Sequence, residues 1–168
     1  FDNDGDLDLY IVSGGNEFEP NTPILKDRIY VNNGNGSLKY IENAIPNNYS
    51  SGMRLSHADY DQDGDIDLFV GGRLVPGSYP LPADSFLLEN ISTSDGIKFI
   101  NTDRSNFPFR DIGLVTSSVW TDYNNDDWID LIVVGEWTPV RFFKNLEGKF
   151  SEDTSMIDSD STRGWNSD

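Results

Sequence analysis

The sequence predicts an all-β protein built from repeated units of about four antiparallel strands. Three observations support this prediction. An acidic loop recurs three times along the chain, each loop is followed directly by a hydrophobic strand, and a β-hairpin pattern repeats in phase with the loops. No stretch of the 168 residues shows the sustained periodicity of an amphipathic helix.

The acidic loops share one internal spacing, with Asp or Asn at alternate positions. They occupy residues 2–8, 59–67 and 122–130, and the first lacks the opening residue of the other two. The residues after the second and third loops, 68–72 and 131–135, are short aliphatic and aromatic runs that end in glycine. Such runs are typical of strands. Equivalent loop positions lie about sixty residues apart, and a fixed period of this kind indicates a repeat architecture.

A β-hairpin pattern follows each loop and its strand. Residues 28–38, 85–99 and 140–150 each combine a strand, a turn rich in Asn and Gly, and a second strand. A further strand pattern, at 53–58 and 114–121, leads into the second and third loops. Each repeat therefore holds about four strands, and repeated four-stranded antiparallel units are the blades of a β-propeller.

Each loop places oxygen-bearing side chains around one centre, because alternate residues of a tight loop point inward. Such an all-oxygen cage suits Ca²⁺, and Mg²⁺ is the second choice because it needs stricter octahedral geometry and gives up its waters reluctantly. The chain has no cysteine and one histidine, which argues against zinc or copper. Carboxylates packed this closely repel one another, so the sequence predicts up to three bound calcium ions.

The turn at the sixth loop position requires an unusual backbone conformation. Gly5 and Gly64 adopt it without steric cost, and Asp127 stands there in the third loop. An EF-hand is excluded because Val70 and Val133 occupy the place of its bidentate glutamate, and a strand replaces its exit helix. Solvated acidic turns without a metal are the remaining alternative, and three copies with one spacing argue against them.

The loop, the strand that ends in Gly-Gly, and the strand with Asn-x-x-Gly before an aromatic residue resemble FG-GAP or VCBS-type repeats, which include the calcium-binding blades of integrin α-subunits. Residues 70–80, 133–139 and 164–166 resemble more closely the repeats that accompany an ASPIC/UnbV domain, as in cartilage acidic protein and its relatives. The resemblance covers nearly the whole chain. It implies a seven-bladed propeller that is displayed outside the cytoplasm.

The resemblance also implies which atoms of each loop bind calcium, with Asp127 as a departure from the glycine of the pattern. The implied ligands are Asp2, Asp4, Asp8 and the Asp6 carbonyl in the first loop; Asp59, Asp61, Asp63, Asp67 and the Asp65 carbonyl in the second; and Asp122, Asn124, Asp126, Asp130 and the Trp128 carbonyl in the third.

The whole chain, residues 1–168, is expected to be a partial propeller with approximate blades at 1–46, 47–108 and 109–168. Propellers close with about four to eight blades, and a stack of three leaves two unpaired sheet edges. We therefore expect the remaining blades to belong to the same, longer protein. The alternative is that short chains assemble into a ring.

The net charge of −17 limits the classes of partner. Nucleic acids and anionic lipid surfaces attract basic proteins, so we expect neither to bind directly. Aromatic residues make up 12% of the chain, too many for a disordered acidic tail. The sequence contains no apolar run long enough to insert into a membrane. Loop sites of moderate affinity fill at extracellular calcium levels, which predicts a secreted or cell-surface protein, with a bacterial outer surface favoured.

Catalysis is not expected in this chain. The single histidine, His57, occupies the repeat position of Trp120, which favours a packing role. Nucleophilic triads need a base beside a serine or cysteine, and no such pattern stands outside the repeats. Nearly all paired carboxylates lie in the predicted metal loops.

Partners are expected on the face opposite the acidic loops, where the long connections lie. Phe18, Arg73, Tyr79 and Trp137 are candidate anchors for a protein or glycan, because aromatic and arginine side chains dominate binding surfaces. These residues could equally pack the loops onto the blades. The favoured function is a calcium-stabilised binding or adhesion module. The alternatives are the propeller domain of a calcium-dependent, lyase-type polysaccharide enzyme and a structural spacer.

Overall fold

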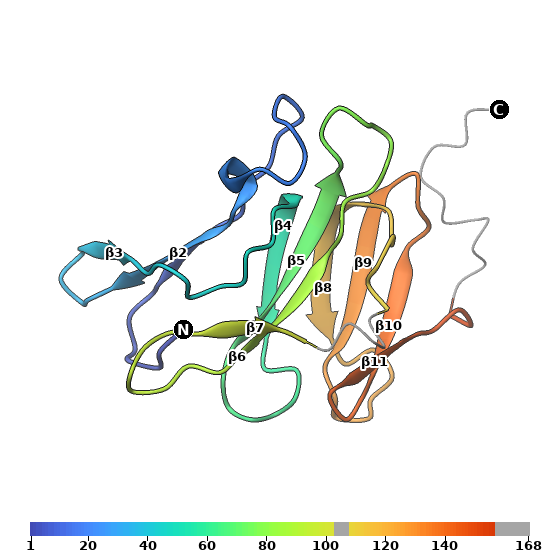
Figure 1. Ribbon diagram of the computed structural model, residues 1–168. Helices are drawn as coiled ribbons and strands as arrows, with labels where there is room; N and C mark the ends of the chain where they lie inside the picture. Colours follow the sequence, from blue (N-terminus) through green and yellow to red (C-terminus); the bar gives the residue numbers. More distant parts are fainter. Residues whose placement is uncertain (103–107, 157–168) are drawn as a thin grey trace.

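The computed structural model describes residues 1–102 and 108–156, and this part of the chain folds into three antiparallel sheets (Figure 1). The first sheet has the order β1-β2-β3, with β1 at Leu9–Ile11, β2 at Arg28–Asn32 and β3 at Leu38–Tyr40. One short 3-10 helix, η1 (Pro23–Leu25), precedes β2. The described residues contain no helix that is long and apolar enough to cross a membrane. The sequence pattern at residues 164–166 lies outside the described residues.

The second and third sheets are four-stranded meanders in which neighbours in the chain are neighbours in the sheet. The second contains β4 (Ser51–Ala58), β5 (Asp67–Leu74), β6 (Phe86–Asn90) and β7 (Phe99–Asn101); the third contains β8 (Leu114–Thr121), β9 (Asp130–Glu136), β10 (Arg141–Leu146) and β11 (Lys149–Glu152). The all-β prediction is therefore confirmed. The number of blades and the closure of a ring stay predictions.

The second sheet is buried on both faces. In the β5 strand, Leu68 and Val70 pack in a cluster shared with Ile29 of the first sheet. The residue between them, Phe69, packs in a second cluster with Val115 of the third sheet. Because successive side chains of a strand point to opposite faces, this one strand joins both cores. Its double burial explains why it reads as a continuous apolar run rather than an alternating one.

Two glycines at the end of β5 permit the close approach of neighbouring segments. A Cβ atom on Gly71 would lie 2.5 Å from Cγ1 of Val115 in the third sheet. A Cβ atom on Gly72 would lie 2.4 Å from the carbonyl oxygen of Ala83, in the connection that follows the same strand. Both distances are far below van der Waals contact. Gly71 thus permits packing between the second and third sheets, and Gly72 permits the β5–β6 connection to fold back on its own strand.

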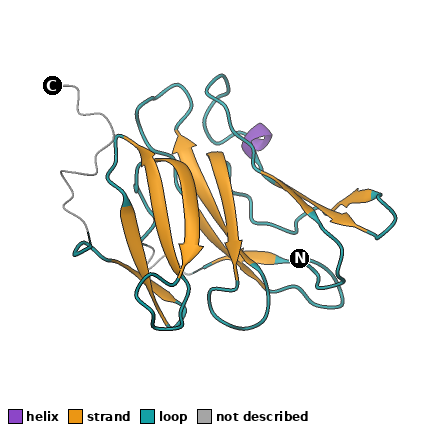
Figure 2. Ribbon diagram, turned by 180° about the vertical axis from the view of Figure 1, so that it is seen from behind, coloured by secondary structure: helices purple, strands orange, loops and turns teal. Residues whose placement is uncertain are grey.

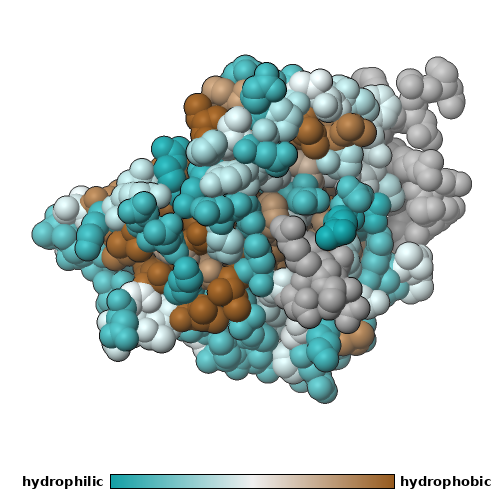
Figure 3. All heavy atoms as spheres, viewed as in Figure 1, coloured by the Kyte–Doolittle hydropathy of each residue, from teal (hydrophilic) through white to brown (hydrophobic). Residues whose placement is uncertain are grey.

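The connections between strands gather at two opposite ends of the sheets. The β4–β5 and β8–β9 connections, which are the second and third acidic loops, leave one end, at the bottom of Figure 1. The long β5–β6 connection and the β9–β10 turn leave the other end, seen also from behind in Figure 2. The face shown in Figure 3 is largely hydrophilic, with apolar side chains in small separate groups.

The strand register confirms that His57 and Trp120 are equivalent positions, since they pair with Leu68 and Leu131. The predicted packing role holds for Trp120, which stacks on Tyr60 with ring centroids 6.5 Å apart. It is wrong for His57, which is exposed. A small polar imidazole gains less from burial than an indole does.

A buried carboxylate, Asp27, closes the connection between β1 and β2. It accepts hydrogen bonds from the backbone N–H of Ser13 at 2.6 Å and from the Tyr10 hydroxyl at 2.9 Å. Burial raises the pKa of Asp27 to about 6, although both hydrogen bonds and the nearby Arg28 act in the opposite direction. Because the folded-state pKa exceeds the unfolded value, ionisation of Asp27 opposes folding.

This carboxylate should make stability fall as pH rises. The protonated carboxyl group makes its full contribution to stability below about pH 4, and this contribution is lost as the pH rises through about 6. The difference between the folded and unfolded pKa corresponds to about 3 kcal/mol in the free energy of unfolding. We expect Asp27→Asn to be more stable than wild type by up to this amount at pH 8, and to match it near pH 4. Urea unfolding at both pH values measures the difference. The exposed Asp95→Asn change is the control, and an Asp27→Asn effect that does not vary with pH would contradict the assignment.

Candidate metal centre

The last aspartate of each acidic loop holds the loop to its own sheet. One of its carboxylate oxygens accepts a hydrogen bond from the backbone N–H of an asparagine near the end of an equivalent strand, which is β2, β6 or β10. The pairs are Asn32 with Asp8 at 2.9 Å, Asn90 with Asp67 at 2.8 Å and Asn145 with Asp130 at 2.8 Å. The three repeats therefore share one anchor, which their common spacing indicated.

The second oxygen of the same aspartate closes the loop on itself. It accepts from the backbone nitrogen at the second loop position, seven residues earlier in the chain. The pairs are the Phe1 amino group with Asp8 at 2.6 Å, Tyr60 with Asp67 at 3.4 Å and Tyr123 with Asp130 at 3.2 Å. Both ends of each loop thus meet at one carboxylate.

Local turns set the path between these ends. The carboxylate of Asp61 accepts from the N–H of Asp63, and that of Asp63 accepts from the N–H of Asp65, at 3.3 and 2.9 Å. Such side-chain-to-backbone bonds are the usual way in which Asp stabilises a turn. At the sixth position Gly64 has φ of 95°, and Asp127 has φ of 70°. Asp127 therefore takes the left-handed conformation that its place in the loop requires.

The second loop gathers carboxylates closely. Oxygen atoms of Asp59, Asp61 and Asp67 all lie within 4.8 Å of one another. Burial raises the pKa of Asp67 to about 7, the Asn90 N–H opposes this shift, and the charge of Asp61 adds to it. The pKa of Asp61 is also raised, by burial and by the charge of Asp63. Burial is the main cause of both shifts, and a positive ion at this point would favour the charged form of both carboxylates.

Among the described residues, two buried oxygens in the loops have no hydrogen-bond donor, and they supply a test of whether a cation fits. They are Oδ1 of Asp59 in the second loop and Oδ1 of Asn124 in the third. The Asn124 amide donates to Asp130 at 3.0 Å, so its oxygen is left as the free acceptor. Buried acceptors without partners are costly, and oxygen donors of this kind suit a hard cation such as Ca²⁺. The residues present therefore fit the ion that the sequence predicts.

The other predicted ligands are less closely gathered. Asp2, Asp4 and Asp6 of the first loop are exposed, as are Asp63 of the second and Asp126 of the third. Asp122 uses its two oxygens to accept from the N–H groups of Asp126 and Asp127. Within the described residues, the second loop is the one place where three acidic side chains meet at this distance.

The charged side chains that lie beside the loops differ between repeats. Lys144 lies 3.1 Å from Asp126 of the third loop. At the same place in the second repeat stands Glu89, whose pKa is raised by burial and then by Asp61 and Asp63. Both residues directly precede the anchoring asparagine. Aligning the third strands of the repeats would have identified them.

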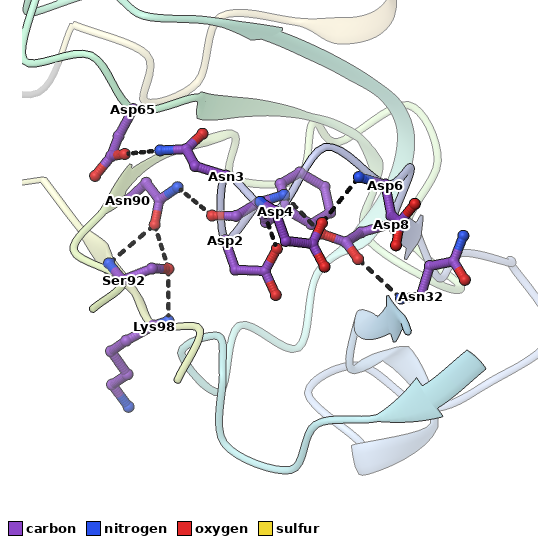
Figure 4. Close-up of polar contacts among 11 residues, drawn as sticks. Asp2, Asn3, Asp4, Asp6, Asp8, Asn32, Asp65, Asn90, Ser92 and Lys98 are labelled. Carbon is purple, nitrogen blue, oxygen red and sulfur yellow. Dashed lines mark hydrogen bonds and ion pairs between the residues drawn. The ribbon is translucent and has the colours of Figure 1, made fainter. Parts of the chain in front are cut away.

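Side-chain amides link the loops of successive sheets. Asn3 of the first loop donates to Asp65 of the second at 2.7 Å, and the Asn90 amide donates to the Phe1 carbonyl at 3.1 Å (Figure 4). Figure 4 shows the Asn3 side chain directed at the carboxylate of Asp65, and Asp8 on the other side of the first loop, next to Asn32. The first and second loops are thereby held side by side.

The same links recur one repeat further along the chain. Gln62 of the second loop donates to the Asp127 carbonyl at 2.8 Å. The Asn145 amide donates to the Tyr60 carbonyl at 2.7 Å and to the Ile129 carbonyl at 3.0 Å. The three loops therefore form one continuous hydrogen-bonded row along this end of the sheets.

At the opposite end, the structure brings three of the four candidate anchors into one cluster. Trp137 donates its indole N–H to the Tyr79 hydroxyl at 2.8 Å, and Arg73 forms an ion pair with Glu136 at 2.7 Å. Phe18, on the β1–β2 connection, is partly buried and takes part in neither contact. Glu136 was missed from the sequence because it lies at the end of a strand, outside any motif.

Comparison with known proteins bears on the first part of the chain. Residues 1–70 match the family model of the FG-GAP-like repeat. The matched FG-GAP-like segment includes the first sheet, β4, the second acidic loop and the start of β5. A comparison with curated proteins found no match. The match supports the FG-GAP repeat family, and FG-GAP repeats suggest a propeller-type binding or adhesion module.

Proposed function

We propose that this protein is a calcium-stabilised part of a β-propeller, which acts outside the cytoplasm as a binding or adhesion module for a protein or glycan. The observation that carries the proposal is the second loop. Three of its carboxylates converge within 4.8 Å, and the buried Oδ1 of Asp59 has no donor among the described residues. The FG-GAP-like match over residues 1–70 supports it.

In this proposal Asp59, Asp61 and Asp67 hold the ion in the second loop, with Asp63 and the Asp65 carbonyl completing the oxygen cage. Calcium would supply positive charge among carboxylates that otherwise repel one another, and magnesium is the second choice. The chain's own contribution is to position the oxygens, through the N–H groups that hold both oxygens of Asp67. The role of the metal is to stabilise the fold.

The wider assignment follows the sequence patterns. We propose a full propeller of seven blades that resembles the calcium-binding blades of integrin α-subunits. The patterns at residues 70–80 and 133–139 favour the subgroup that accompanies ASPIC/UnbV domains. A binding role is favoured over catalysis, because nearly all paired carboxylates lie in the loops that are assigned to the metal. The charge of −17 favours partners other than nucleic acids, and sites that fill at extracellular calcium favour a secreted or surface location.

Calcium titration calorimetry tests the metal site, and the charges beside the loops sharpen the test. We expect Glu89→Gln to lower the calcium affinity of the second loop and Lys144→Gln to raise that of the third. Each change should be about two- to fivefold, since exposed charge pairs contribute at most about 1 kcal/mol. The lysine competes with the ion for Asp126, whereas the glutamate adds negative charge beside Asp61.

The matched control is Lys39→Gln on β3, which makes the same charge change at an exposed position. It should leave both affinities unchanged at fixed ionic strength. Absence of any binding heat at millimolar calcium would refute the metal site. Equal shifts from Lys39→Gln and Lys144→Gln would show that only net charge matters.

A further inference from the structure

Four residues at the end opposite the acidic loops form a cluster that the metal loops do not explain. Tyr79 comes from the β5–β6 connection of the second sheet, and Trp137 from the β9–β10 turn of the third. Glu136, the last residue of β9, directly precedes Trp137 in the chain and forms an ion pair with Arg73, near the end of β5. We call these four residues the aromatic–ion cluster.

The two aromatic side chains are held in place while remaining open to solvent. Trp137 is 58% exposed and Tyr79 is 52% exposed. The 2.8 Å hydrogen bond between them fixes one side chain relative to the other across two sheets. Large exposed aromatic side chains that are also ordered present apolar surface at a low entropic cost of binding.

The backbone at Trp137 is strained in a way that keeps the indole exposed. Its φ of 57° lies in the left-handed region, which costs a bulky residue on the order of 1 kcal/mol or more. The next residue, Thr138, is buried and donates its hydroxyl to the Ile112 carbonyl at 3.1 Å. Strain that the surrounding structure retains at an exposed side chain is typical of binding sites.

The ion pair beside the aromatic residues supplies polar groups without net charge. Glu136 has a side chain that is 48% exposed, whereas that of Arg73 is 19% exposed. The Nη1 atom of Arg73 is buried and has no hydrogen-bond partner among the described residues. Because this donor is buried, the polar group that the pair offers to a ligand is the half-exposed Glu136 carboxylate.

We propose that the aromatic–ion cluster is a subsite for one neutral sugar ring of a glycan, which deepens the binding role proposed above and depends on it. A pyranose ring has an apolar C–H surface and a rim of hydroxyl groups. The C–H surface packs on Trp137 and Tyr79, and the sugar hydroxyl groups donate to the half-exposed Glu136 carboxylate, which Arg73 holds in place. The Tyr79 oxygen accepts from the indole, so its own O–H is free to donate to the sugar.

The charge of the cluster selects neutral over acidic sugars. Glu136 balances Arg73, so no net positive charge remains to attract a carboxylate or sulfate, and the chain as a whole carries −17. A protein partner is less favoured, because its contacts depend on apolar anchors in desolvated pockets. This cluster instead combines exposed aromatic surface with a charged pair at its side.

The test is an NMR titration of the calcium-loaded protein with three neutral oligosaccharides, cellohexaose, laminarihexaose and mannohexaose. The indole N–H resonance of Trp137, assigned by its absence in Trp137→Phe, should shift saturably with at least one of them. Trp137→Ala and Tyr79→Ala should each weaken binding about tenfold or more. The control is Tyr40→Ala, which removes an exposed aromatic side chain from β3 and should leave the affinity unchanged.

Three results would overturn the proposal. One is that none of the three sugars shifts the indole resonance of Trp137, which would favour a protein as the partner of this face. Another is binding that survives both aromatic substitutions. The third is a stronger response to an oligogalacturonate, an acidic glycan, than to the neutral sugars. Each variant is also melted with and without calcium, so that loss of the metal-dependent fold is distinguished from loss of the sugar site.

Discussion

Calcium is expected to raise the midpoint of thermal unfolding of the metal-free protein by roughly 5–10 °C for each site that it fills. An ion that binds only the folded chain stabilises it by about 2.7 kcal/mol when its concentration is a hundredfold above its dissociation constant. The second loop should dominate, because Asp59, Asp61 and Asp67 converge there and the buried Oδ1 of Asp59 has no donor among the described residues.

Differential scanning calorimetry with calcium and with a chelator, at constant ionic strength, measures this effect. Asp59→Asn should remove most of the stabilisation that calcium gives and should change the metal-free midpoint much less. Asp84→Asn, an exposed change in the β5–β6 connection, is the matched control. Identical midpoints with calcium and chelator would mean that the loops hold themselves together without an ion.

Replacing Asn145 by alanine is expected to lower the free energy of unfolding by about 4 kcal/mol, because three hydrogen bonds of its buried side chain are lost together. The Asn145 side chain is fully buried, donates to the Tyr60 and Ile129 carbonyls, and accepts from the Gly148 N–H at 2.8 Å. One of these bonds joins the third sheet to the second loop. The substitution should therefore weaken contact between two sheets as well as the turn after β10.

Urea unfolding of calcium-loaded protein measures this loss. Asn145→Asp keeps the acceptor for Gly148 but lacks the amide donors, so it should be almost as unstable as the alanine variant. Asn47→Ala, at an exposed asparagine whose side chain has no hydrogen bond to the described residues, should change stability by less than about 0.5 kcal/mol. A loss below about 1 kcal/mol for Asn145→Ala would show that the link between the sheets is dispensable.

Much of the fold could be predicted because local signals agree with one another. The strand at residues 68–72, the hairpin at 28–38 and the loop at 59–67 each follow from spacing and turn chemistry. The repeat adds strength, since each weak local signal occurs at the same place in another unit. The equivalence of His57 and Trp120 was found in this way, although the burial of His57 was predicted wrongly.

The contacts between sheets could not be predicted, because they join side chains far apart in the sequence. Asn145 reaches a carbonyl 85 residues earlier, and nothing in the sequence near it indicates that partner. The turn conformation of Trp137 could not be predicted from the sequence, since bulky residues rarely adopt a positive φ. Glu89 and Lys144 lie outside the loops whose charge they alter, so a search confined to the acidic motif passes over them.

The amide links between loops have a consequence for how such proteins lengthen. Two of these links join an asparagine amide in one repeat to a carbonyl in the preceding repeat, namely Asn90 to Phe1 and Asn145 to Tyr60. The second repeat carries both halves, the donor Asn90 and the acceptor Tyr60. If one whole repeat is duplicated or deleted in the gene, the repeats that become neighbours therefore still carry a matching amide donor and carbonyl acceptor.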